Sequence, residues 1–427
     1  MLITRNDMRS LFAFLLFIAG LGLSHGDHSQ AVAAEEAAKP KVAIRQLTSG
    51  PKHHFFGYYG ICPWNKSGNY LVCLESDFQD HLPKPDEAAS VVLVDAKTGA
   101  VNKVGETRAW NFQQGAMLYW NPLKPDDEIL FNDRKDDAIV SVALDVHTGQ
   151  KRYLPRGISD VAHNGRHALC LDYGRLYRTR PVVGYVGVKD PNADNPHPDN
   201  DGVFLMDLAT GESKLVLSIG EVYRRLVGAH PELKDRDMFF NHTVFNKDDS
   251  RFFVLARCWE PKPKPYLESA MFTCNTDGSD LREVVPFGKG ISHFDWKNTK
   301  EILATFDLDG KGYKQHVLFT DGLKDYKAIG KGFLTGDGHP AFSPDGQWIV
   351  NDRNDSKTGA KSLQLYHPAG GTGMALGSFP MKDYLSGDLR CDLHPRWNRA
   401  GDAICVDALE TTHWTRQLHV AYLEFGK

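Results

Sequence analysis

Four histidines in the second half of the chain have the residue type and spacing of a catalytic or metal-binding set: His242, His293, His339 and His394. Each stands three residues before an aromatic residue, and long intervals separate one from the next. Neutral imidazole binds Mn, Zn, Fe or Ni, and it serves as a base near neutral pH. If the fold brings these side chains together, they predict a divalent-metal site with an open position.

Carboxylates accompany the histidines. Asp337 and Asp392 each stand two residues before one of them. We expect these two to act as ligands or as acceptors that orient the neighbouring imidazole. His293 has no acid just before it, but Asp295 follows two residues later and is the candidate partner of that ring. The alternative interpretation is that polar residues merely face a wet channel.

Further candidates for substrate binding precede the histidines. The segment 53–59, His-His-Phe-Phe-Gly-Tyr-Tyr, contributes His54 and Tyr58, although a packing role would explain it equally well. Three arginines lie close together in one long interval between repeats: Arg175, Arg178 and Arg180. Guanidinium groups bind carboxylate or sulfate in a bidentate manner. The alternative is a solvated cluster on a loop.

A repeat explains how distant histidines could meet. An anchor residue, a polar turn and a short apolar strand recur seven times, and the anchors are Trp64, Trp120, Val161, Phe245, Trp296, Phe342 and Trp397. An alternating strand that runs into a Gly-containing hairpin turn follows each copy, as in residues 91–99. Two hairpins per repeat predict a four-stranded antiparallel blade, and seven blades predict an all-β propeller. Six or eight blades are the competing counts.

The ends of the chain predict how the ring closes. Residues 41–47 form an orphan strand, and the last repeat stops at Lys427 without a fourth strand. We expect residues 42–47 to pair with 418–423 and complete the last blade, because that edge would otherwise stay unpaired. Residues 35–427 are therefore interpreted as a single domain. The histidine position would lie at the start of each innermost strand, near the axis.

Residues 1–34 have the features of a signal peptide: Arg5 and Arg9, an apolar run over 11–23, and a small-residue pattern ending at Ala33. We expect cleavage there and an exported protein, periplasmic or secreted, with an uncleaved anchor as the alternative. No later run approaches the ~20 apolar residues of a membrane span. The net charge of -4 gives no basic excess for nucleic acid. Seven cysteines, without CxxC spacing, imply no disulfide framework.

The residues resemble those of the oligogalacturonate lyases, seven-bladed TolB-like propellers. The likeness includes the segment 54–62 running into Trp64-Asn65-Lys66-Ser67-Gly68, the turn 275–279, and histidines in four consecutive late blades. It implies that His339 and His394, with Asp392, bind a divalent metal, with manganese the first candidate and zinc, iron or nickel the alternatives. It also implies that His293 is the base, and His242 is the second catalytic candidate of the ring.

Two departures from that family pattern bear on the chemistry. A family arginine falls on Ala270, so Arg257 is the candidate that replaces it, and the approach to the last ligand is reduced to Asp392-Leu393-His394. The function implied is a metal-dependent lyase that cleaves uronate-containing acidic oligosaccharides or polysaccharides by β-elimination. The alternative is a non-catalytic TolB-like envelope propeller that binds a protein or glycan partner. A metal-dependent hydrolase or lactonase is the third hypothesis.

Overall fold

The computed structural model describes residues 39–260, 266–355 and 358–426. The chain divides into two compact units, Met1–Glu35 and Glu36–Lys427, and the second contains all of the described structure. The predicted signal peptide lies outside the described residues. All seven cysteines lie among the described residues as free thiols.

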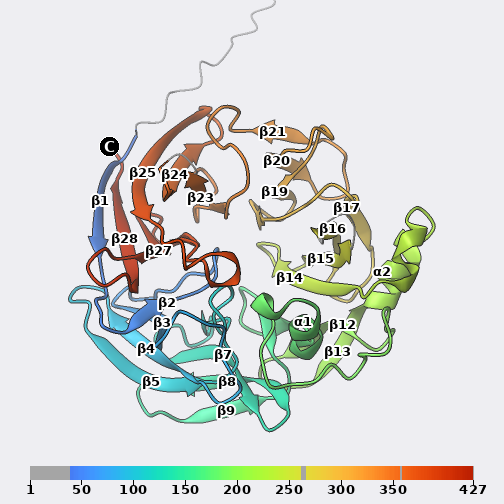
Figure 1. The fold of residues 1–427 in the computed structure, drawn as a ribbon, viewed down its shortest axis with the longest axis horizontal. Coiled ribbons are helices and arrows are strands. Elements are labelled where there is room, and N and C mark those ends of the chain that lie inside the picture. Colours follow the sequence, from blue (N-terminus) through green and yellow to red (C-terminus); the bar gives the residue numbers. More distant parts are fainter. Residues whose placement is uncertain (1–38, 261–265, 356–357, 427) are drawn as a thin grey trace, which may run out of the picture. The chain divides into compact units, whose positions relative to one another are not determined.

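Seven four-stranded antiparallel sheets make up the described part of the second unit and follow one another around a ring (Figure 1). This confirms the predicted seven-bladed β-propeller over six or eight blades. The first three blades, from the inner strand outward, are β2 (His53–Phe55), β3 (Tyr70–Ser76), β4 (Ala89–Asp95) and β5 (Val101–Thr107); β6 (Tyr119–Trp120), β7 (Glu128–Lys135), β8 (Ala138–Asp145) and β9 (Lys151–Leu154); and β10 (Ile158–Val161), β11 (His167–Cys170), β12 (Gly202–Asp207) and β13 (Ser213–Ser218).

The later blades contain the four histidines, with His242 within its inner strand and the other three one or two residues before theirs. The fourth to sixth blades are β14 (Phe239–Phe245), β15 (Arg251–Glu260), β16 (Tyr266–Asn275) and β17 (Arg282–Val285); β18 (Phe294–Trp296), β19 (Glu301–Phe306), β20 (Gln315–Thr320) and β21 (Lys327–Ile329); and β22 (Ala341–Phe342), β23 (Ile349–Asp355), β24 (Ala360–His367) and β25 (Thr372–Pro380). The seventh combines both ends of the chain: β26 (Arg396–Trp397), β27 (Ala403–Leu409), β28 (Arg416–Glu424) and β1 (Lys41–Gln46).

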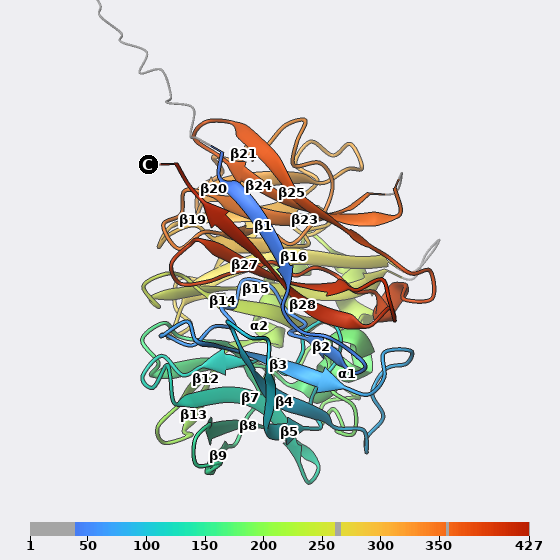
Figure 2. The same ribbon diagram turned by 90° about the vertical axis from the view of Figure 1, so that its left-hand side faces the viewer.

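The N-terminal strand closes the ring, as predicted. β1 pairs antiparallel with β28, with Val42 opposite Leu423 and Gln46 opposite His419 (Figure 2). This pairing satisfies backbone groups on an edge that would otherwise be exposed. The two ends of the chain therefore hold the first and last blades together.

Three of the repeated anchor residues, all tryptophans, tie their blade to the preceding one. The indole Nε1 of Trp120 donates to the carbonyl of Pro63 at 2.8 Å, and the indoles of Trp296 and Trp397 donate to the preceding blades at 3.1 Å. An aspartate makes a further contact between blades, since Asp295 Oδ2 accepts from the Phe342 N–H at 2.7 Å. These contacts set the register of one inner strand on the next. They explain why three of the seven anchors are tryptophans that face the preceding blade.

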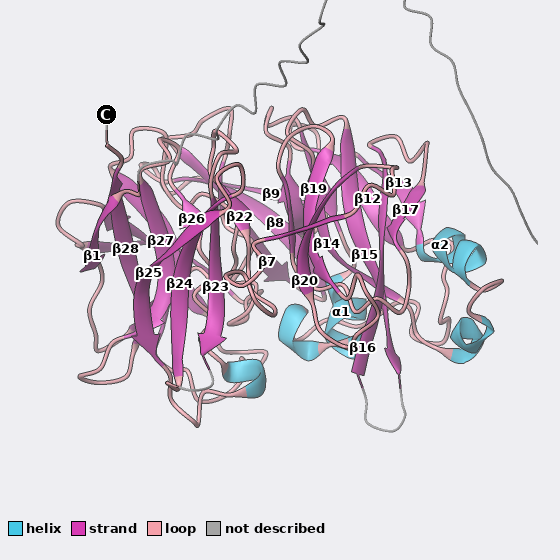
Figure 3. Cartoon of the chain, turned by 90° about the horizontal axis from the view of Figure 1, so that it is seen from above, coloured by secondary structure: helices cyan, strands magenta, loops and turns pink. Residues whose placement is uncertain are grey.

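The long interval between the third and fourth anchors contains most of the helical structure. Its helices, and one short turn near the C-terminus, are α1 (Tyr173–Thr179), η1 (Pro181–Val183), α2 (Ile219–Leu226), η2 (Pro231–Asp235) and η3 (Gly387–Leu389). Figure 3 shows α1 on the side of the ring where β15 and β16 also extend. No described helix is long and apolar enough to cross a membrane.

Candidate metal and proton-transfer site

A cavity of about 480 Å³ near the inner strands is lined by all four predicted histidines. The rings of His293 and His339 have centroids 4.1 Å apart, and those of His339 and His394 are 4.4 Å apart. Tyr59 packs against these three rings at 5.1 to 6.3 Å. The repeat alignment therefore brought together residues that are far apart in the sequence.

His293 forms a pair with Asp337 (2.8 Å, Nδ1 to Oδ1), and not with the expected Asp295. Asp295 is instead used between blades, where it accepts the backbone N–H of Phe342. Because an ionised carboxylate only accepts, His293 Nδ1 donates and Nε2 keeps its lone pair. Burial lowers the pKa of His293 to about 4, although Asp337 acts against that shift. The ring is thus neutral at physiological pH and available as a base.

Asp337 is fixed from several sides. Its Oδ2 accepts from Lys314 Nζ and from Ser292 Oγ, each at 2.8 Å, and Oδ1 accepts from Thr305 at 3.0 Å. Burial acts to raise the pKa of Asp337, but His293 and Lys314 hold it well below its ordinary value. The carboxylate therefore stays ionised and keeps His293 in one tautomer. This is a correction to the expectation that Asp337 supports His339.

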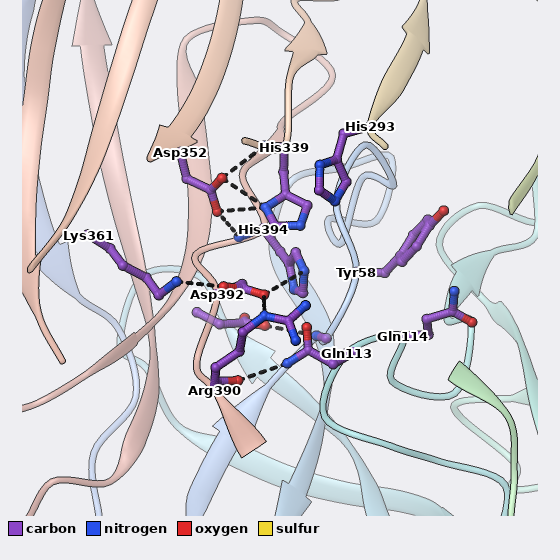
Figure 4. Close-up of polar contacts among 12 residues, drawn as sticks. Tyr58, Gln113, Gln114, His293, His339, Asp352, Lys361, Arg390, Asp392 and His394 are labelled. Carbon is purple, nitrogen blue, oxygen red and sulfur yellow. Dashed lines mark hydrogen bonds and ion pairs between the residues drawn. The ribbon is translucent and has the colours of Figure 1, made fainter. Parts of the chain in front are cut away.

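The partner of His339 is Asp352, on β23. Its Oδ1 accepts from both the backbone N–H and Nδ1 of His339, at 2.9 and 2.8 Å (Figure 4). Its Oδ2 accepts the backbone N–H of His394 at 3.2 Å. One buried carboxylate thus orients both histidines predicted as metal ligands. His339 Nε2 is left with no hydrogen bond within the described residues.

His339, Asp392 and His394 are the group best placed to hold an ion. Their ligand atoms all lie within 4.8 Å of one another, and all three residues are buried. His394 Nδ1 is buried without a hydrogen-bond partner among the described residues, and its Nε2 is 4.0 Å from Asp392 Oδ2. Two imidazoles and one carboxylate with an open side suit a first-row divalent cation. The residues therefore fit the predicted metal.

Local backbone geometry helps to aim two of the histidines. His242 and His394 have φ values of 57° and 45°, in a region that non-glycine residues seldom adopt. At His242 the register of β14 on β15 also shifts, between Asn241 and Val244. Such outliers persist only where the surrounding structure imposes them, and they concentrate at functional sites.

His242 is engaged by a tyrosine. Its Nδ1 lies 2.8 Å from the Tyr58 hydroxyl and 3.4 Å from Gln114 Nε2. Burial, together with Arg257 and Arg180, lowers the pKa of His242 well below its ordinary value. Both predicted residues, His242 and Tyr58, line the cavity. Because Nδ1 is occupied, Nε2 is the atom of His242 left for a ligand.

Arg180 and Arg257 place two positive charges at the same cavity. Neither guanidinium has a hydrogen-bond or ion-pair partner among the described residues, and Arg257 is only 4% exposed. Burial, and then the charge of Arg390, lowers the pKa of Arg180 to about 10, and burial, then Arg180, lowers that of Arg257 to about 9. Both are still charged at neutral pH. Arg257 lies one residue along β15 from the position opposite Ala270.

Three other predicted substrate residues lie outside this cavity. Arg175 is buried and donates to the carbonyls of Met238 and Pro196 at 2.8 Å, while Arg178 is held by Asp190 and Asp237. His54 lies 2.9 Å from Gln417 and 3.1 Å from Glu75. These contacts account for all three side chains structurally. We therefore do not retain Arg175, Arg178 and His54 as substrate-binding candidates.

Several side chains at or beside the cavity had not been predicted: Tyr59, Gln113, Gln114, Lys314, Asp352, Lys361 and Arg390. Most come from second strands or connecting loops, which carry no repeat position. Two of them had a signal in the sequence, because Tyr59 belongs to the segment 53–59 and Arg390 stands two residues before a predicted ligand.

Comparison with solved structures places the fold among propellers. An oligogalacturonate lyase in complex with manganese is 15% identical, with 90% of this chain and 98% of that one covered and a TM-score of 0.62. An oligogalacturonate lyase from Vibrio parahaemolyticus is 12% identical over the same shares, with a TM-score of 0.61. The β-propeller domain of the Trilobed protease from Pyrococcus furiosus is 12% identical, with 87% and 94% covered and a TM-score of 0.52.

These likenesses confirm the predicted resemblance at the level of the fold. A protease also contains a β-propeller domain of similar fold, so the fold alone does not choose a function. No family model matches the chain, and no curated protein matches it in sequence.

Proposed function

We propose that this protein is a metal-dependent lyase that cleaves uronate-containing oligosaccharides or polysaccharides by β-elimination, with manganese the first candidate for the metal. The observation that carries the proposal is that His293, a neutral imidazole paired with the ionised Asp337, lines the same cavity as His339 and His394, whose ligand atoms cluster with those of the buried Asp392. A base next to a cation site is what abstraction of a proton adjacent to a carboxylate requires.

Each side chain has a distinct task in this proposal. A bound divalent cation would polarise the uronate carboxylate and so acidify the neighbouring C5 proton. His293 accepts that proton at Nε2, because Nδ1 is committed to Asp337. Asp337, ionised between His293 and Lys314, stabilises the imidazolium that forms. The 4-O substituent then leaves with the electron pair of the C4–O bond as the C4–C5 double bond forms.

Arg180 and Arg257 support an acidic substrate. A buried cation without a partner is costly, and a carboxylate supplied by the ligand would satisfy it. Tyr58 and His242 line the same cavity and are the candidates for contacts to sugar hydroxyls, with His242 the second candidate for proton transfer. Since the cavity lining is polar and the substrate anionic, an acidic oligosaccharide is the proposed ligand.

The test separates base from ligand. With Mn²⁺ and oligogalacturonates, the purified protein should form an unsaturated product, detected by its ultraviolet absorbance. His293→Ala should lose about 10²-fold or more in kcat and keep the metal. His339→Ala should lose both metal and turnover, and His147→Ala, on an outer turn beside Asp127, should change neither. Metal content is measured for each folded variant by atomic spectrometry.

Three results would contradict the proposal. Loss of metal in His293→Ala with retention in His339→Ala would reverse the roles of base and ligand. Binding of acidic glycans without any unsaturated product would favour the non-catalytic, TolB-like propeller. A saturated product of hydrolysis would favour the hydrolase or lactonase hypothesis.

Export belongs to the same proposal. Residues 1–34 have the pattern of a signal peptide and lie outside the described residues, so cleavage near Ala33 stays a prediction, as does a mature single domain from residue 35 onward. Sequencing the N-terminus of the protein recovered from a periplasmic or secreted fraction tests both.

A further inference from the structure

Asp392, the carboxylate of the candidate metal cluster, already has a cation on each oxygen. Lys361 Nζ donates to Oδ1 and Arg390 Nε donates to Oδ2, both at 2.5 Å (Figure 4). The Asp392 side chain is only 5% exposed. Its charge is therefore neutralised by the protein itself.

The two cations are held very differently. Lys361 is 6% exposed and also donates to Asn354 at 2.6 Å, so its ammonium group is fixed inside the blade. Arg390 is 35% exposed, lines the cavity, and has one further side-chain contact, from Nη1 to the Gly387 carbonyl at 3.0 Å. Of the two, Arg390 is the partner that can leave Asp392 by rotating its side chain.

Arg390 occupies the oxygen that a metal would need. Oδ2 is the Asp392 atom 4.0 Å from His394 Nε2. Metal bonds to nitrogen and oxygen of about 2.0 to 2.2 Å can bridge such a pair. A guanidinium bonded to that same oxygen would lie close to a doubly charged ion, and the two positive charges would repel each other strongly.

We propose that Arg390 and a divalent cation are alternative partners of Asp392 Oδ2, so that metal loading releases Arg390 into the cavity. This inference rests on the metal site of the proposed function. Arg390 is here a positioning residue, which sets the affinity for the metal. The positive charge of Arg390 already lowers the pKa of Arg180. Once released, Arg390 would be a third cation beside Arg180 and Arg257, in the part of the cavity proposed to bind the acidic ligand.

Two consequences follow from this exchange. The wild type binds the metal more weakly than its ligands alone would allow, because the ion must first displace a charge-assisted hydrogen bond. Metal and acidic ligand also favour each other's binding, since each benefits when Arg390 leaves Asp392.

The experiment is a calorimetric titration of the full chain, freed of metal by chelation, with Mn²⁺ alone. We expect Arg390→Gln to bind Mn²⁺ about 10-fold or more tightly than the wild type. Arg390→Lys, which keeps a competing cation, should return toward the wild-type affinity. Asp392→Asn should lose binding. The matched control is Arg108→Gln, an exposed arginine 3.9 Å from Glu106 and outside the cavity, which should behave as the wild type.

A second titration measures the coupling. The affinity for galacturonate is determined with and without Mn²⁺, and the gain caused by Mn²⁺ should be larger in the wild type than in Arg390→Gln. Equal or weaker Mn²⁺ binding by Arg390→Gln, in a wild type that does bind Mn²⁺, would overturn the exchange and leave the proposed function standing. Absence of Mn²⁺ binding in the wild type and all variants would overturn both.

Discussion

Two sets of arginines around one short segment have opposite surroundings. Arg175 and Arg178, on α1, are neutralised by Asp190 and Asp237, and Arg175 also donates to several backbone carbonyls. Arg180, just after that helix, and Arg257, on β15, have no partner among the described residues. Trp259 Nε1 donates to the Thr179 carbonyl at 2.8 Å and holds the two elements together.

The presence or absence of a carboxylate partner distinguishes structural arginines from candidate ligand-binding arginines, which the residue type alone does not. A buried charge without a partner costs free energy, whereas a buried charge with carbonyl and carboxylate partners stabilises the loop that supplies them. Arg175 thus orders the polar segment 190–196. In the proposed function, the charges of Arg180 and Arg257 are instead neutralised by the acidic ligand. In the sequence, all of these arginines look alike.

Among the variants that test this comparison, Arg175→Met should change the free energy of unfolding the most. Removing one partner of a buried ion pair costs about 3 to 5 kcal/mol, because it leaves buried acceptors and Asp190 without their cation. We expect the free energy of unfolding to fall by about that amount in denaturant titrations, while the folded fraction still binds acidic oligosaccharides normally.

Arg178→Gln is the matched variant on the same helix. Its side chain is 30% exposed, so the loss should stay within about 1 kcal/mol. A large loss of ligand affinity in either variant, measured on folded protein, would break the distinction between the two sets.

Arg257→Gln should have the reverse profile. Affinity for acidic oligosaccharides should fall about 10- to 100-fold, the value of one charge-assisted contact. Stability should stay equal or rise, because an unpaired buried charge is removed. Calorimetry with oligogalacturonate and thermal unfolding of the same preparation provide both numbers. A destabilised variant with unchanged affinity would assign Arg257 to the structural set.

The features that the sequence predicted correctly are those that follow from the repeated blade. The seven anchors mark equivalent positions in the blades, three of them through an indole that donates to the preceding blade, and aligning them placed His242, His293, His339 and His394 at one cavity. Closure by residues 41–46 followed from an unpaired edge. Both are consequences of backbone geometry that every blade shares.

What the sequence missed depended on side-chain partners. Asp337 was assigned to His339 by proximity in the chain, but both residues lie in the loop before β22, and there Asp337 reaches His293 of the preceding blade. Asp352 supports His339 from a second strand, where no repeat position marks it. Arg175 and Arg178 were grouped with Arg180 for the same reason, since only the fold reveals which arginines the carboxylates reach.

The last expected effect is on the pH dependence of stability and concerns Asp201, an exception within the neutralised region. Its Oδ1 accepts from the Gly202 N–H at 2.6 Å, but Oδ2 is buried without a partner among the described residues. Burial, and then Asp172, raises the pKa of Asp201 to about 7, although Arg175 acts against the shift. The unfolded value is about 3.9, so between about pH 4 and pH 7 the native state holds a proton that the unfolded state lacks. Stability from this group therefore falls as pH rises through that window, by at most about 1.4 kcal/mol per pH unit. Asp201→Asn cannot titrate, so its unfolding free energy should decline less steeply than that of the wild type in denaturant titrations across this range. Parallel curves for the two proteins would show that Asp201 is ionised in the fold and neutralised like its neighbours.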